Sequence, residues 1–137
     1  MTPVGEHLFT LEADLGPVLE VGRTPVGVRR VIPIIGGTVS QGLDGVILPG
    51  GADWNLERPD GSGELWARYE LRLAGGAVVS VTNTAVHAPG ADPILTTPRF
   101  DVGDDGPVEL RTGVYVGVLH PPTTRPRVRI EVHRITV

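Results

Sequence analysis

The chain has 137 residues, a formal net charge of −4 and no cysteine. This length predicts one domain over residues 1–137, with a core large enough to need no disulfide. The missing cysteines exclude disulfides, thiolate metal sites and cysteine nucleophiles, and fit the reducing cytoplasm in which we expect the protein. The acidic balance and scattered arginines argue against a nucleic-acid partner. No apolar run approaches the ~20 residues of a membrane span, so we expect no membrane partner.

Short alternating or apolar segments run through the chain, separated by 19 glycines and 13 prolines. This pattern predicts strands and leaves no room for long helices. The expected strands cover residues 7–15, 26–35, 38–48, 64–73, 77–86, 94–101, 108–119 and 127–137. We therefore predict an all-β chain folded as a single closed antiparallel barrel of about 8–10 strands, lipocalin-like or allene-oxide-cyclase-like. A closed barrel exposes no strand edge, and its interior can hold one small ligand.

The segment 45–69, GVILPGGADWNLERPDGSGELWARY, concentrates the side chains that could carry chemistry. Because neighbouring strand residues face opposite sides, Glu64, Trp66 and Arg68 share one face. Leu65, Ala67 and Tyr69 share the other. Either the apolar set fills the barrel and the charged set faces solvent, or the charged set lines a partly polar lumen. The residue types alone leave both interpretations open.

Several short motifs recur in a fixed order along the chain, namely Gly36-Gly37, Pro49-Gly50-Gly51-Ala52-Asp53-Trp54, Pro59-Asp60-Gly61, Glu64-Leu65, Ala67-Arg68-Tyr69, Asn83 and Arg99-Phe100. In these motifs the chain resembles the DUF3237 family, also called UPF0311. The resemblance implies a compact antiparallel β-barrel and no particular reaction. It favours a charged lumen, because Glu64 and Arg68 fall on positions of the family's motif. Trp66 departs from the small acidic residue that the resemblance leads us to expect.

A charged lumen would bring Asp53 and Glu64 into one partly apolar cavity. Desolvation and mutual repulsion would then shift their pKa values, so that one could act as general base and the other as general acid. Arg68 or Arg99 would hold a carboxylate or enolate oxygen of the substrate. The alternative for Asp53 is a turn cap that accepts hydrogen bonds from nearby backbone groups.

The remaining candidates are binding residues. Trp54, Trp66 and Tyr115 would supply flat walls, and Tyr69 is a buried phenol in need of a partner. Asn83 interrupts an apolar strand face, which indicates an inward amide. His7 fits a core histidine better than a catalytic base. No histidine spacing is typical of a metal site, and no nucleotide motif is present, so we expect neither a metal nor a cofactor.

These observations favour a cofactor-independent acid–base enzyme, an isomerase, cyclase or lyase, acting on a small hydrophobic molecule in the barrel lumen, in secondary metabolism. The alternative is a non-catalytic barrel that binds and carries a small ligand. A third interpretation is a structural oligomer whose interior is fully packed. Val114, Val116 and Val118 could bury an outer patch against a second copy, so we expect a homodimer.

Overall fold

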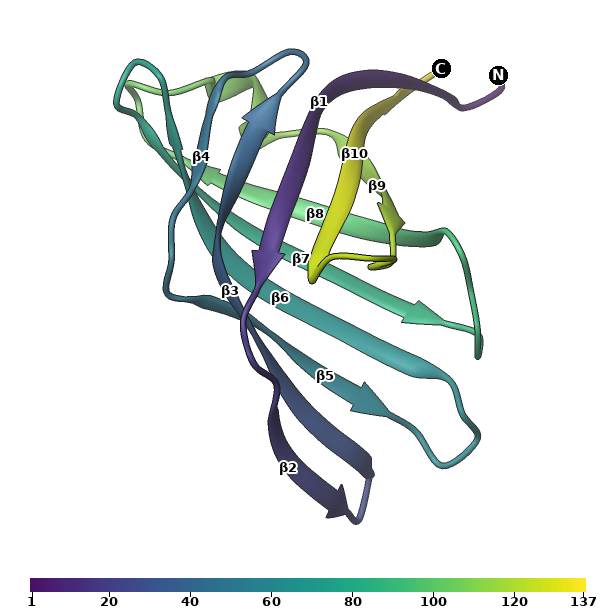
Figure 1. Ribbon diagram of the computed structural model, residues 1–137. Coiled ribbons are helices and arrows are strands. Elements are labelled where there is room, and N and C mark those ends of the chain that lie inside the picture. Colours follow the sequence, from purple (N-terminus) through teal and green to yellow (C-terminus); the bar gives the residue numbers. More distant parts are fainter.

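The computed structural model describes all residues, 1–137, and consists almost entirely of antiparallel strands (Figure 1). In chain order the elements are β1 (Val4–Leu15), β2 (Leu19–Thr24), β3 (Gly27–Ser40), β4 (Gly45–Ile47), β5 (Gly51–Glu57), β6 (Gly63–Leu73), β7 (Val78–His87), β8 (Ile94–Val102), the 3-10 helix η1 (Val108–Arg111), β9 (Val114–His120) and β10 (Arg127–Thr136). All ten strands belong to one sheet, in the order β1-β10-β9-β8-β7-β6-β4-β3-β2, with β5 between β3 and β6.

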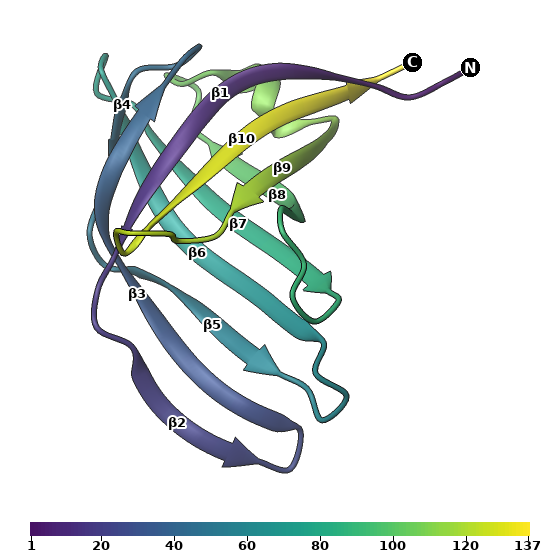
Figure 2. The ribbon, with the colours of Figure 1, turned by 45° about the vertical axis from the view of Figure 1, so that its right-hand side comes forward.

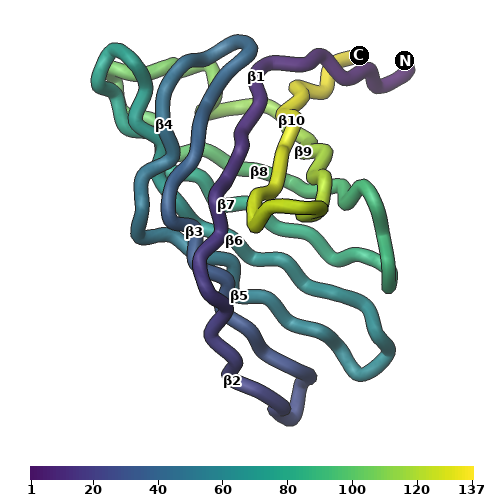
Figure 3. Tube along the Cα trace, viewed as in Figure 1, coloured from purple at the N-terminus to yellow at the C-terminus, as the bar shows by residue number.

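The sheet closes on itself because β1 pairs with β10 on one side and with β3 on the other. β4 and β5 follow one another along a single gap between β3 and β6, and so share one position in the ring. β2 pairs only with β3 and lies outside the ring. The ten strands therefore give eight positions around a closed barrel, which confirms the predicted fold class. Figures 2 and 3 show the β2–β3 hairpin projecting beyond one end of the barrel as an arm.

Three predicted strands differ from the observed ones. The predictions missed β2 and β5, and they divided β3, which runs without a break to Ser40. β3 can continue through Gly36-Gly37 because β1 crosses close to it there: a Cβ on Gly37, whose φ is +143°, would lie 2.0 Å from the Glu12 carbonyl oxygen. The first part of the predicted strand 108–119 is η1, whose carbonyl at Glu109 accepts hydrogen bonds from Tyr115 and Arg134.

Side chains fill one half of the barrel. Phe9, Phe100 and Tyr115 form a chain of edge-to-face aromatic contacts, with ring centroids 5.9 and 5.3 Å apart. Leu71, Val79, Val81 and Val132 are fully buried around these rings. This half forms a packed floor, above which the other half of the lumen remains open. The structure contains no helix of the length and apolar character that crossing a membrane requires.

Candidate functional site

The open half of the barrel holds a cavity of about 230 Å³. Pro121 and Pro122, in the connection between β9 and β10, line it, so residues 121–126 lie at the rim as the sequence predicts. The other lining residues are Ala13, Leu15, Ile32, Ile34, Asp53, Asn55, Leu65, Ala67, Tyr69, Asn83, Ile94, Leu119, Val128 and Ile130. Most of these side chains are apolar, and Asp53 is the only charged one. The lumen is therefore incompletely packed, against the third interpretation of the sequence.

Asp53 lies on the inner side of β5 with only 9% of its surface exposed. The ladder between β5 and β6 is interrupted after the Asp53–Ala67 pair, and in this gap Asp53 Oδ1 accepts a hydrogen bond of 2.9 Å from the Trp66 backbone N–H. Asn55 Nδ2 donates to Oδ2 at 3.3 Å. Burial raises the pKa of Asp53 above its usual value, and these two hydrogen bonds offset only part of that effect. Asp53 is thus a carboxylate disposed to take up a proton.

Tyr69 and Asn83 place two further polar groups against the same cavity. Each residue is 1% exposed, and neither the Tyr69 hydroxyl nor the Asn83 side-chain oxygen has a hydrogen-bond partner in the protein. Burial raises the pKa of the Tyr69 phenol far above its usual value, so it remains a neutral O–H donor. Buried polar groups normally find a partner, so two orphans beside one cavity suggest a ligand that supplies it.

The cross-strand register explains how these groups come together. Asp53 pairs with Ala67 on β6, and Ala67 pairs with Asn83 on β7, so the three residues form one row across three strands. Tyr69 lies two residues beyond Ala67 on the same inner face. Because Ala67 carries only a methyl group, Asp53 and Asn83 face a common space with no side chain between them. The small residue in the middle of the row is what keeps the cavity open.

The predicted charged lumen is wrong. Glu64, Trp66 and Arg68 lie on the outer face of β6, while Leu65, Ala67 and Tyr69 fill the barrel. Glu64 forms an ion pair with Arg58 at 2.9 Å, and Arg68 Nη2 lies 3.4 Å from Ser80 Oγ on the outside. The hydrophobic effect decides this orientation, because the inverse one would place two charged groups inside and three apolar ones in water. Asp53, Glu64 and Arg68 therefore do not converge.

The two tryptophans also lie outside. Trp54 is 40% and Trp66 45% exposed, and their rings meet edge to face with centroids 5.6 Å apart on the outer surface. Arg99 is exposed on the outer face of β8. Tyr115 is buried in the packed half, where its hydroxyl bonds to the Thr112 carbonyl at 2.8 Å. None of these four residues lines the lumen cavity.

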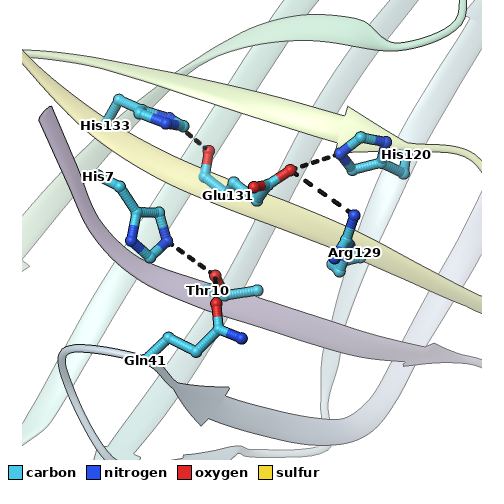
Figure 4. Close-up of polar contacts among 7 residues, drawn as sticks. All are labelled: His7, Thr10, Gln41, His120, Arg129, Glu131 and His133. Atoms are coloured by element: carbon cyan, nitrogen blue, oxygen red, sulfur yellow. Dashed lines mark hydrogen bonds and ion pairs between the residues drawn. The ribbon is translucent and has the colours of Figure 1, made fainter. Parts of the chain in front are cut away.

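His7 is exposed on the outside of β1, where the sequence predicts a core histidine. Figure 4 shows its ring beside Thr10, whose Oγ1 lies 2.9 Å from His7 Nε2. A second polar group nearby joins His120 to Glu131 at 2.6 Å, with His133 on the same strand as Glu131. The bulge between His7 and Phe9 shifts the alternation of β1, which is why His7 does not follow Phe9 and Leu11 inward. No group of three or more His, Asp or Glu side chains is arranged to hold a metal ion.

The sequence analysis missed two residues near the site. Asn55 follows Asp53 on the inner side of β5, and the alternation of β5 would have revealed it had that strand been recognised. His87 lies beside the mouth, where its ring covers Gly63: a Cβ on Gly63 would lie 2.4 Å from His87 Nε2. The charge of His87 acts weakly on Asp53 and lowers its pKa, against the larger effect of burial.

The inner side chains form an apolar chamber with a proton-accepting carboxylate, a neutral O–H donor and an amide. Such a set can move a proton between carbon or oxygen atoms of a bound molecule and can stabilise the charge that develops. The cavity offers no cationic group as a partner for an anion. The arginine that the sequence analysis assigned to the substrate's oxygen is thus replaced by Tyr69 and Asn83.

Comparison with known proteins places this barrel among relatives. The family model "Protein of unknown function (DUF3237)" matches residues 3–135. A UPF0311 protein of Bradyrhizobium diazoefficiens is 35% identical over 153 residues, with 98% of this chain and 99% of the relative covered. A UPF0311 protein of Clostridium acetobutylicum is 40% identical over 83 residues, with 59% of this chain and 52% of the relative covered.

Solved structures give the same grouping. A conserved protein of unknown function from Rhodopseudomonas palustris superposes with a TM-score of 0.89 at 34% identity, covering 99% of both chains. A β-barrel-like protein from Acinetobacter baumannii gives a TM-score of 0.87 at 26% identity, covering 99% of this chain and 98% of that one. An enzyme from Penicillium herquei shares the fold at 23% identity, with a TM-score of 0.81 and coverage of 99% and 96%. The chain belongs to the DUF3237 family.

Proposed function

We propose that the protein is a cofactor-independent acid–base enzyme, an isomerase, cyclase or lyase, that acts on a small hydrophobic molecule in the barrel lumen. The observation that carries this proposal is the position of Asp53, a carboxylate with a raised pKa in an apolar cavity beside the unpartnered hydroxyl of Tyr69. Pairs of groups whose environments suit them to opposite proton-transfer roles are typical of acid–base sites.

In this reaction Asp53 is the base. Its carboxylate takes a proton from a carbon next to the substrate's carbonyl group: the C–H bond breaks, its electron pair forms a C=C bond, and the carbonyl π electrons move to oxygen. The Tyr69 hydroxyl donates a hydrogen bond to that oxygen and stabilises the enolate. Asp53, now a carboxylic acid, returns the proton to another carbon in an isomerase or to a departing group in a lyase.

The apolar lining and the dry interior also favour the second candidate, a barrel that binds and carries a ligand without changing it. Both candidates predict binding in the lumen and differ in turnover. The shared fold with an enzyme of Penicillium herquei supports the catalytic candidate only in that this barrel can carry an enzyme.

The test is the conversion of 3-cyclohexen-1-one to 2-cyclohexen-1-one, followed by ultraviolet absorbance, for the wild type and Asp53→Asn. An acid–base enzyme should accelerate the conversion, and Asp53→Asn should lose roughly a hundredfold or more of that rate while still binding the ketone. Equal rates for the two proteins, with binding retained in both, would favour the carrier and contradict the proposal.

A further inference from the structure

The lumen carries information about its ligand beyond the type of chemistry. Three properties of the cavity bear on the ligand: its volume, the charges that line it, and the hydrogen-bonding groups that the protein leaves unpartnered. The argument rests on the proposed function only in placing the substrate in this cavity.

Volume limits the size of the enclosed part. An apolar cavity of about 150 Å³ is known to hold benzene. The cavity here is about 230 Å³. It therefore has room for one six-membered ring with a short substituent, and a larger molecule would have to extend past Pro121 and Pro122 at the mouth.

Charge excludes anions. Asp53 is the single charged residue of the lining, and no Arg, Lys or His side chain lines the cavity. A carboxylate, phosphate or sulfate group placed there would lose its hydration, meet a second negative charge and find no cation to offset either cost. The ligand that these walls accept is not an anion.

The unpartnered groups argue against a cation as well. An ammonium group could pair with Asp53, but it has no lone pair to accept the hydrogen of Tyr69. The Tyr69 hydroxyl would stay unpartnered in an apolar surrounding, at the full cost of a buried donor. A carbonyl oxygen accepts that hydrogen. In the enol form of the same compound the O–H group can in turn donate to Asn83 Oδ1, the second orphan.

We infer that the substrate is an uncharged carbonyl compound whose enclosed part is one ring in size, with its oxygen held between Tyr69 and Asn83. Ala67, in the row between Asp53 and Asn83, sets this size because every larger side chain would project into the space that the ring occupies. Ala67 is therefore the specificity-determining residue of the site.

Three probes of matched shape test the inference: acetophenone, benzoate and 1-phenylethylammonium. They share a phenyl ring and a branched substituent of equal size, and differ in charge. Binding is measured at pH 7 by the shift of the Asn83 side-chain amide signals in ¹H–¹⁵N NMR spectra. We expect acetophenone to shift these signals saturably and to bind at least about tenfold more tightly than either ion.

Variants locate the bound probe. Tyr69→Phe should weaken acetophenone binding by about three- to tenfold, since only the hydroxyl is removed. Ala67→Leu should abolish it. Thr84→Val, a change of similar size on the outer face of β7, is the matched control and should bind like the wild type. Affinities that ignore Tyr69→Phe and Ala67→Leu would overturn the assignment of the oxygen and of the size limit.

The outcomes separate this inference from the proposed function. Tighter binding of benzoate or 1-phenylethylammonium, or no binding of any probe, overturns the inference and leaves proton transfer on another substrate to be judged by turnover. Selective binding of acetophenone supports the inference even where Asp53→Asn shows that no proton transfer takes place, a result that would overturn the proposed function alone.

Discussion

The Asp53 carboxylate accepts the backbone N–H of Trp66 at 2.9 Å, within the gap of the β5–β6 ladder. The two side chains point in opposite directions, Asp53 into the lumen and Trp66 to the outer surface. The side-chain bond satisfies a donor that the interrupted ladder does not pair and fixes the carboxylate against the cavity. One residue thus serves the structure with Oδ1 and faces the lumen with Oδ2.

Asp53 should make stability depend on pH in a direction opposite to most carboxylates. Its pKa in the folded state lies above the unfolded value of 3.8. Its contribution to the free energy of unfolding is therefore full below that value and is lost as pH rises through the folded pKa. We expect the unfolding free energy of the wild type, relative to Asp53→Asn, to fall with pH across this window.

Urea unfolding of the two proteins at a series of pH values measures this difference. Asp60, Asp104 and Glu131, whose pKa values are lowered, act in the opposite direction and are present in both proteins, so the subtraction removes them. A difference that rises with pH would show that Asp53 is stabilised as a carboxylate, contrary to its burial.

Tyr69→Phe should make the protein more stable and less active. The hydroxyl is buried without a partner, so its removal relieves a desolvation cost and is expected to raise the free energy of unfolding by about 1 kcal/mol. Turnover should fall because the donor to the substrate's oxygen is gone. Thermal unfolding and the isomerisation assay measure the two effects, and a loss of stability would mean that the hydroxyl has a structural partner.

Ala67→Leu should fill the lumen without unfolding the barrel. The added carbons enter a cavity of about 230 Å³, so the strain is expected to stay below about 1.5 kcal/mol. Ligand binding and turnover should both be lost. A protein that keeps its melting temperature and its turnover would show that the reaction takes place elsewhere.

The outward charged residues should be dispensable. Glu64 and Arg58 form an ion pair whose side chains are 41% and 38% exposed, so Glu64→Gln is expected to change stability by less than about 0.5 kcal/mol. Arg68→Gln should be similarly mild. Both variants should keep the turnover of the wild type. A large loss in either one would return the active site to the outer face.

The fold was predictable because alternation in 64–73, 77–86 and 94–101 is strong, and these segments are β6, β7 and β8 with small differences at their ends. Asn83 was recognisable as an inward amide because it interrupts an apolar face. β5 escaped prediction because its pattern is inverted: Asp53 and Asn55 face the lumen, and Trp54 faces water. Polar residues inside and an aromatic outside contradict the usual signal, and a functional lumen is where that signal is expected to fail.

The orientation of β6 could not be read from its own residues. Glu64 and Arg68 belong to the sequence pattern of the family, and that pattern favoured an inward position for them. The register with β5 and β7 decides the question, since Ala67 must lie between Asp53 and Asn83. Contacts between strands far apart in the sequence, which the sequence alone does not reveal, fix this register.

Hydrogen exchange at the carbon next to a ketone tests the central claim most directly. Acetophenone is incubated in D₂O with the wild type, Asp53→Asn or Glu64→Gln, and loss of the methyl proton signal is followed by NMR. Proton transfer by Asp53 predicts exchange above the buffer rate for the wild type and Glu64→Gln, and the buffer rate for Asp53→Asn. Exchange that survives Asp53→Asn, or that disappears in Glu64→Gln, would contradict a lumen site built on Asp53.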